Sequence, residues 1–283
     1  MIPSCIREAA VAGRFYPALT VDLNRTLDEL LSSQPSLQRS VTLHRPAKSG
    51  RPAVLAMVPH AGYIYSGRIA GATFARIDVP EHVVVLGPNH TGLGRARALW
   101  SRGAWRTPLG DIEVAEDLAD CLKRHARLDD DELAHVHEHA IEVLLPFLKR
   151  KQPRVRIAPV CLARLSLADC LALGEALAVG IREFGRQVLL VCSTDMSHYI
   201  SAELARELDQ LALDQIQALN PSGLYQTVTE RRISMCGFVP TTVGLAAACA
   251  LGGSHVELVA YGNSGETSGD FARVVGYAGA WVG

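Results

Sequence analysis

VLAMVPHAGYIYSGRIAGATFARIDVPEHVVVLGPNHTG, residues 54–92, contains two continuous apolar runs separated by a helical pattern. The runs VLAMV (54–58) and VVVLG (83–87) carry no polar alternation, which is typical of strands buried on both faces. The segment 66–76 between them shows a helical pattern. A strand, a helix and a second strand in this order indicate a parallel sheet covered by helices.

The same alternation continues along the rest of the chain. The loop GNSGETSGD (262–270) joins the last two predicted strands without a helix, so we expect a hairpin-like closing pair and a mixed sheet. We predict one α/β domain over residues 1–283, with a central, largely parallel mixed sheet and helices on both faces. The Ser- and Pro-rich stretch 34–52 is interpreted as a surface connection within that domain. The further strands are expected at 157–163, 188–193, 256–261 and 274–282, and the further helices at 22–32, 115–125, 138–151, 166–184, 201–219 and 238–251.

Composition excludes several classes of protein. The 283 residues are 48% hydrophobic and carry 28 basic and 29 acidic residues without a basic stripe, so nucleic acid is a poor candidate partner. No apolar run reaches the roughly 18 residues that span a bilayer. The seven cysteines lack the regular spacing of a disulfide framework, and the first residues lack a secretory signal. We therefore expect a cytoplasmic protein with free thiols.

Polar side chains follow three of the predicted strands. His60 comes after the strand at 54–58, His90 after the strand at 83–87, and Asp195 and His198 after the strand at 188–193. In open α/β sheets the carboxyl ends of the strands line the ligand crevice. A single histidine there is usually structural, but three strand ends of this kind together indicate a functional site.

Cys236 precedes an apolar helix expected from residue 238. The unpaired N–H groups at a helix N-terminus favour a thiolate, so Cys236 is a candidate ligand or nucleophile. A small buried residue remains the alternative.

The segment HEHAIE (137–142) is the remaining cluster of ligand-type side chains. On the predicted helix, His139 and Glu142 are neighbours on one face, so we expect one of them to face the crevice while His137 and Glu138 point elsewhere. The alternative is an ordinary solvated helix start, where acidic residues are common.

Several of these segments, read together, resemble the Memo family. This family is similar in fold to the class III extradiol dioxygenases, which are non-haem iron enzymes that open catechol rings. The resemblance follows the family's order from residue 12 almost to the end of the chain. The segments that carry it are AGRFYP (12–17), VPHAGYIYSG (58–67), LGPNHTG (86–92), EHAIEVLLPFL (138–148), STDMSHY (193–199) and MCGFVPTTVGL (235–245).

The resemblance implies a role for each candidate residue. It implies that His60, His90 and Cys236 bind a metal ion, with Cys236 at a position where the ring-cleaving enzymes carry a glutamate. It implies that His198 is catalytic and that Asp195 accompanies it. The candidates for substrate contact are His139, Glu142, Tyr63 and Tyr199.

The cysteine at the third metal position changes the expected chemistry. A thiolate is softer than a carboxylate, and it favours Cu(I), zinc or thiolate-ligated iron over the iron site of the dioxygenases. We therefore expect iron(II) or copper(I), possibly zinc, and no organic cofactor, with redox or dioxygenase-like chemistry on a small molecule.

Two other functions stay open at this point. In a metal-free hydrolase, Cys236 would be the nucleophile, His198 the base and Asp195 the group that orients it. In a non-catalytic protein, the crevice would recognise a peptide or a metabolite.

Overall fold

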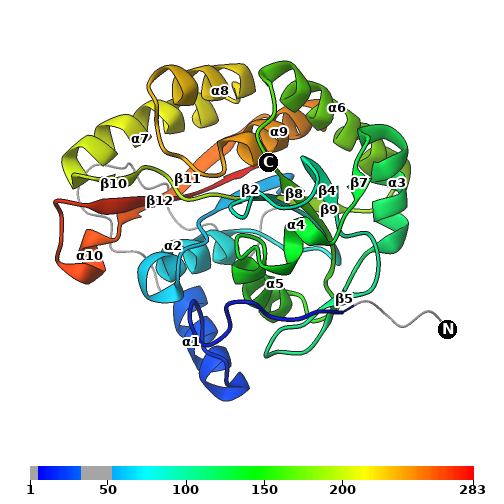
Figure 1. Cartoon of the computed structure of the whole chain (residues 1–283), viewed down its shortest axis with the longest axis horizontal. Helices are drawn as coiled ribbons and strands as arrows, with labels where there is room; N and C mark the ends of the chain where they lie inside the picture. Colours follow the sequence, from blue (N-terminus) through cyan, green and yellow to red (C-terminus); the bar gives the residue numbers. More distant parts are fainter. Residues whose placement is uncertain (1–5, 33–52) are drawn as a thin grey trace.

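A nine-stranded sheet forms the centre of the molecule in the computed structural model, which describes residues 6–32 and 53–283 (Figure 1). The predicted surface connection at 34–52 lies outside the described residues. Eight strands follow one another in the order β10-β12-β2-β9-β3-β8-β4-β7, and β11 pairs with β12. The strands are β2 (Leu55–Val58), β3 (His82–Pro88), β4 (Arg97–Leu99), β7 (Asp129–Asp130), β8 (Arg156–Leu162), β9 (Val188–Ser193), β10 (His198–Ile200), β11 (Val256–Asn263) and β12 (Val274–Val282).

The middle of this sheet is parallel, and antiparallel pairs flank it on both sides, since β4 is antiparallel to β8 at the other side. β2 runs parallel to β9, β9 to β3, and β3 to β8. β12 is antiparallel to β2, to β11 and to β10. The predicted mixed sheet and its closing pair of strands are therefore confirmed. The carboxyl ends of β2, β9 and β3 lie next to one another at one edge, where the candidate residues follow.

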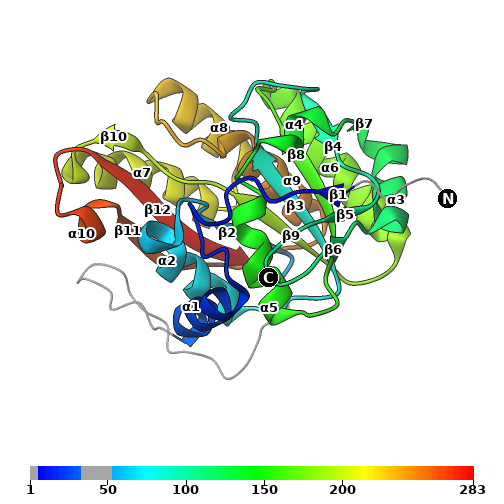
Figure 2. The ribbon, with the colours of Figure 1, turned by 60° about the horizontal axis from the view of Figure 1, so that its bottom comes forward.

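Helices cover both faces of the sheet, as predicted. Side chains alternate along β2, so that Leu55 and Met57 join one hydrophobic core while Ala56 and Val58 join the other. Figure 2 shows α6, α8 and α9 on one side of the sheet and α1, α2 and α5 on the other. The helices are α1 (Thr20–Ser32), α2 (Tyr63–Arg76), α3 (Glu116–Ala126), α4 (Leu133–Val136), α5 (Leu145–Lys151), α6 (Leu167–Phe184), α7 (Ala202–Gln217), α8 (Pro221–Glu230), α9 (Phe238–Ala250) and α10 (Gly265–Ser268).

A small second sheet fastens the N-terminal segment to the domain. β1 (Ile6–Arg7) pairs in parallel with β5 (Ala104–Trp105), which pairs with β6 (Ile112–Glu113). These strands are too short to give a periodic signal in the sequence. Their importance is that they bring Arg7 beneath the residues that follow α4.

Two predicted helices differ from the observed ones. The helix expected at 138–151 begins only with a 3₁₀ turn at Glu142–Leu144 and continues as α5, whose first turn holds Pro146. Proline is tolerated in a first turn but not in a helix interior, so an uninterrupted helix through this point was a wrong expectation. The helix expected at 201–219 is α7, and a separate helix α8 follows, with Asn220 as its N-cap.

None of the helices in the described ranges combines the length and the apolar character that crossing a membrane requires.

Candidate metal centre

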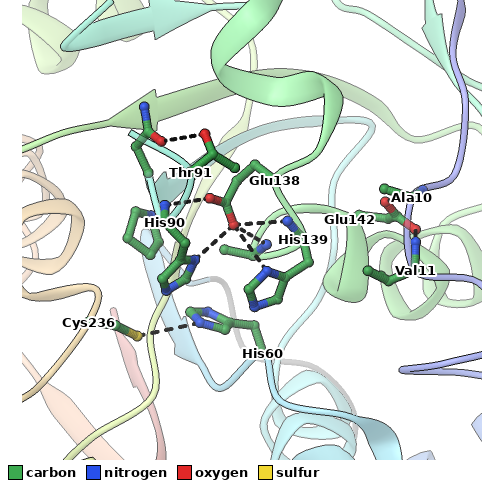
Figure 3. Close-up of polar contacts among 12 residues, drawn as sticks. Ala10, Val11, His60, His90, Thr91, Glu138, His139, Glu142 and Cys236 are labelled. Carbon is green, nitrogen blue, oxygen red and sulfur yellow. Dashed lines mark hydrogen bonds and ion pairs between the residues drawn. The ribbon is translucent and has the colours of Figure 1, made fainter. Parts of the chain in front are cut away.

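Three histidines meet at the edge formed by the carboxyl ends of the parallel strands (Figure 3). His60 follows β2, His90 follows β3, and His139 lies between α4 and the 3₁₀ turn. The ring centroids of His60 and His90 are 5.2 Å apart, those of His60 and His139 are 5.4 Å apart, and those of His90 and His139 are 4.7 Å apart. One possible ligand atom from each ring lies within 4.8 Å of the others, so the three could hold a metal ion.

The hydrogen bonds of His60 determine which ring nitrogen is free. Nδ1 of His60 lies 2.8 Å from Oγ of Ser193, and that hydroxyl donates to the carbonyl oxygen of Ala140 at 2.6 Å. Since the hydroxyl proton is used by a carbonyl that can only accept, Nδ1 of His60 must donate to Ser193. Nε2 therefore carries the lone pair. Burial, reinforced by His139, lowers the pKa of His60 and keeps the ring neutral.

Glu138 orients His90 in the same way. Nδ1 of His90 donates to Oε1 of Glu138 at 2.8 Å, so Nε2 is the nitrogen of His90 that can bind a metal ion. The carboxylate accepts three more bonds, from the backbone N–H groups of His90, His139 and Ala140. Burial favours the neutral acid, but the hydrogen bonds from His90 and the backbone outweigh it and lower the pKa of Glu138. Such a buried carboxylate behind a histidine is a common support for a metal ligand.

Glu138 was therefore misjudged from the sequence, where we expected it to point elsewhere. That expectation rested on helical spacing, whereas residues 138–141 are not in a helix. The acidic residue next to a histidine was present in the sequence, but nothing local indicated that it would reach His90, 48 residues earlier.

Cys236 lies beside His60. Its Sγ is 3.4 Å from Nε2 of His60 and accepts the backbone N–H of Asp195 at 3.3 Å. Burial raises the pKa of the Cys236 thiol well above its usual range, and the Asp195 carboxyl adds to the effect. The N-terminus of α9 favours the thiolate of Cys236, as expected, but burial favours the neutral thiol. A cation bound at Nε2 of His60 would again favour the thiolate.

Asp195 and His198 flank this cluster but do not pair with each other as the hydrolase alternative requires. Oδ1 of Asp195 accepts the backbone N–H of His60 at 2.9 Å, and burial raises the pKa of Asp195 to about 7. Nδ1 of His198 donates to the carbonyl oxygen of Ser234 at 2.9 Å, which leaves Nε2 as the proton acceptor. Burial lowers the pKa of His198. Since Ser234 orients His198, and Cys236 contacts His60, no Cys236–His198–Asp195 relay is formed.

Glu142 does not face the crevice. Its carboxylate is fully buried, forms an ion pair with Arg7 and accepts a hydrogen bond from the Tyr16 hydroxyl. It also accepts hydrogen bonds from the backbone N–H groups of Ala10 and Val11 (Figure 3). All of its acceptor capacity serves the N-terminal segment. The expected substrate contact is therefore wrong for this residue, because the i,i+3 helical pairing with His139 on which it rested is not formed.

The two tyrosines named from the sequence lie in different surroundings. Tyr63 is buried, and its hydroxyl donates to the carbonyl oxygen of Val143 at 2.9 Å, which is a structural contact. Tyr199 is 67% exposed and adopts the left-handed region with φ of 60°. It lies beside His198, with ring centroids 5.8 Å apart, so a ligand that reached His198 could also meet Tyr199.

Comparison with known proteins agrees over nearly the whole chain. A family described as "Memo-like protein" matches residues 7–281. A "MEMO1 family protein" of Aquifex aeolicus is 39% identical over 275 residues, which cover 97% of this chain and 98% of that protein. A relative of the same description from Methanopyrus kandleri is 39% identical and covers 96% of this chain and 97% of its own. Methanosarcina acetivorans has a further one, 39% identical over 274 residues.

Proposed function

This chain belongs to the Memo family, and from that premise we propose that it is a metal protein in which His60, His90 and Cys236 hold a redox-active ion. The observation that carries the proposal is the protonation pattern of the two histidines. Both donate through Nδ1 to protein oxygens, which leaves Nε2 of each ring as the nitrogen that can bind a metal ion, and burial keeps His60 neutral. Neutral imidazoles oriented by hydrogen bonds are the state in which histidine binds metal ions.

Ring geometry supports a choice of the third donor. A metal ion bound by imidazole lies close to the plane of the ring, along the nitrogen lone pair. The planes of His60 and His90 are at 76° and those of His60 and His139 are at 84°, so either pair could share an ion. Of the two partners, His90 has its Nδ1 hydrogen-bonded to the buried carboxylate of Glu138. His90 and His139 are stacked at 18°, and two nearly parallel planes do not meet nearby. We therefore propose Cys236, next to Nε2 of His60, as the third ligand, and His139 as a group that contacts substrate.

The types of donor atom restrict which metal ions the site can bind. Two imidazoles and a thiolate suit iron(II), copper(I) or zinc, and the first two would supply one-electron chemistry to a bound small molecule. His198 would accept a proton at Nε2, since Nδ1 is held by Ser234. Asp195, whose pKa is about 7, would hold a proton close to His60 and Cys236.

Access to the site is consistent with a small ligand. The side chains of His90 and His139 are 32% and 25% exposed, whereas His60 is buried. We propose that a small molecule or the end of a peptide reaches the ion past His90 and His139. The six cysteines in the described residues are free thiols, which a reducing compartment favours, and we propose the cytoplasm as the location.

Anaerobic titration with Fe(II) and Cu(I) tests the proposed ligand set. Cys236→Ser should weaken binding by more than roughly 100-fold, since it removes a ligand whereas loss of an outer support typically costs 10–100-fold. His139→Gln should weaken binding much less. Cys249→Ser, which changes an exposed thiol, is the matched control. Equal affinities in wild type and Cys236→Ser would reject Cys236 as a ligand, and a strong loss in His139→Gln would place His139 in the metal shell.

A further inference from the structure

A pocket of 530 Å³ adjoins the metal centre on the side of Cys236. Its wall is built from the loops after β3 and β8 and from the segment that joins α8 to α9. Cys236 belongs both to this wall and to the histidine cluster, where its Sγ contacts Nε2 of His60. A molecule in the pocket would therefore lie directly beside the proposed metal ligand. A pocket of this volume suits a small organic molecule.

The wall of the pocket combines an apolar surface with positive charge. Leu162, Val228, Ile233 and Val239 are each at least 95% buried in the fold and form a firm apolar lining. Arg164 and Arg232 also line the pocket, and no lining residue is acidic.

Neither arginine is paired with another side chain in the part of the chain that the structure describes. Within residues 6–32 and 53–283, no hydrogen bond or ion pair joins the guanidinium group of Arg164 or Arg232 to another residue. Some other arginines on the surface do pair with a carboxylate, as Arg102 does with Glu116 and Arg124 with Glu183. Two unpaired guanidinium groups on an apolar wall are complementary to an anion with an apolar body, because guanidinium binds carboxylate in a bidentate fork.

The backbone of Arg232 determines which substitution can test its charge. Its φ is 55°, in the left-handed region that glycine adopts most easily. An arginine there costs roughly 1 kcal/mol of backbone strain that a glycine would avoid. A left-handed residue is common where a helix ends, and Arg232 closes α8 in this way, with the backbone N–H of Ile233 donating to the carbonyl oxygen of Val228. Glycine is therefore suited to position 232, which makes Arg232→Gly a substitution that the fold tolerates.

We propose that this pocket binds a small organic acid, with its anionic group on Arg232 and Arg164 and its apolar body on the wall between Leu162 and Val239. The proposal deepens the proposed function and rests on it, because it places this acid as the substrate beside the metal ligand Cys236. The binding itself needs only the pocket, so the two can be tested separately.

Fluorescence titration with 2-naphthoate and its neutral counterpart 2-naphthamide tests the charge requirement. The acid should bind at least about tenfold more tightly than the amide, which is the scale of one charge-assisted hydrogen bond. Arg232→Gly should remove that preference, and Arg232→Lys should retain part of it. Since glycine relieves the strain at this position, Arg232→Gly should be no less stable than wild type, so that a loss of binding is not a loss of fold.

Arg127→Gly is the matched control. Arg127 is an exposed arginine with φ of 47° at the end of α3, and it does not line the pocket. It should leave 2-naphthoate binding unchanged. Equal affinities for acid and amide, or an unchanged affinity in Arg232→Gly, would overturn the proposal.

The titration is repeated on chelator-treated and Zn(II)-loaded protein to separate the two proposals. If the protein binds Zn(II) normally but binds the acid and the amide equally well, the organic-acid site alone is overturned. Preference for the acid in a protein that fails to bind metal supports the pocket and overturns the metal function.

Discussion

At the scale of single residues, Glu138 connects the most parts of the metal centre, because one buried carboxylate holds the ring of His90 and three backbone N–H groups. Glu138→Gln keeps the shape but removes the charge and presents N–H groups where acceptors are needed. We expect metal affinity to fall about 10–100-fold with the fold retained. Competition with a chromophoric chelator measures this. Glu116→Gln, at an exposed ion pair with Arg102, is the control, and equal losses in both variants would contradict the role of Glu138.

The buried ion pair of Arg7 and Glu142 predicts a large effect on stability. Arg7 also donates to the carbonyl oxygens of His135 and Glu138, at 3.0 Å and 2.6 Å. Arg7→Met would leave the Glu142 carboxylate buried without its cation, so the free energy of unfolding should fall by about 3–5 kcal/mol. Urea denaturation measures this, with Arg25→Met at the exposed pair with Asp22 as the control. Adding Glu142→Gln to Arg7→Met should recover part of the loss. A single variant as stable as wild type would show that the pair is not required.

The buried side chain of His135 should make the free energy of unfolding depend on pH. Burial, reinforced by Arg7, lowers its pKa to about 4, whereas in the unfolded chain it is about 6.5. Between these values the unfolded state binds a proton that the folded state does not, so stability is lost as pH falls from about 6.5 to about 4. The loss approaches about 3 kcal/mol.

His135→Phe, placed against the rings of Trp100 and Trp105, should remove this loss. Urea unfolding at pH 7 and pH 4.5 compares the two proteins. The decrease should be about 2–3 kcal/mol larger for wild type than for the variant. Equal decreases would mean that another group is responsible.

Some of the site residues could be predicted from the sequence and others could not. His60 and His90 directly follow apolar strands, so their meeting at one sheet edge follows from parallel pairing alone. The roles of Glu138 and Glu142 depend on partners 48 and 135 residues away, His90 and Arg7, and no local pattern encodes those contacts.

At the scale of elements, the packing of α1 on α2 depends on two glycines of α2 that differ in what they face. A Cβ at Gly71 would lie 2.4 Å from the backbone oxygen of Leu30, whereas a Cβ at Gly67 would first meet the flexible end of the same leucine side chain at 2.9 Å. Gly71→Ala should therefore lower the free energy of unfolding by about 1–3 kcal/mol through overpacking. Gly67→Ala should cost clearly less. Thermal or urea unfolding of both variants is the measurement, and a reversed order would contradict this packing.

The segment 138–151 shows where helical periodicity misleads. Its apolar spacing continues from α5 back to Ile141, but residues 138–141 are not helical. The carboxylate of Glu138 takes up backbone N–H groups there, including those of His139 and Ala140. Side-chain acceptors of this kind compete with helix formation, and the sequence pattern does not report the competition.

At the scale of the whole molecule, the alternation of buried strands and helices sufficed to predict the α/β class, the parallel centre and the antiparallel closing pair. These follow from local hydrophobic patterns. The short strands β1, β4, β5, β6, β7 and β10 carry no such pattern and are stabilised by tertiary contacts. The segment before α9 also carries no periodic pattern. The closeness of Cys236 to His60 could therefore be proposed from the family resemblance but not from periodicity.

X-ray absorption spectroscopy of the Zn(II)-loaded protein tests the central claim most directly, because it reads the donor atoms around the ion. A ligand set of His60, His90 and Cys236 predicts one sulfur scatterer at about 2.3 Å together with imidazole nitrogens at about 2.0–2.1 Å. The sulfur contribution should disappear in Cys236→Ser and persist in His139→Gln. A spectrum with nitrogen and oxygen neighbours only, unchanged by Cys236→Ser, would contradict the claim.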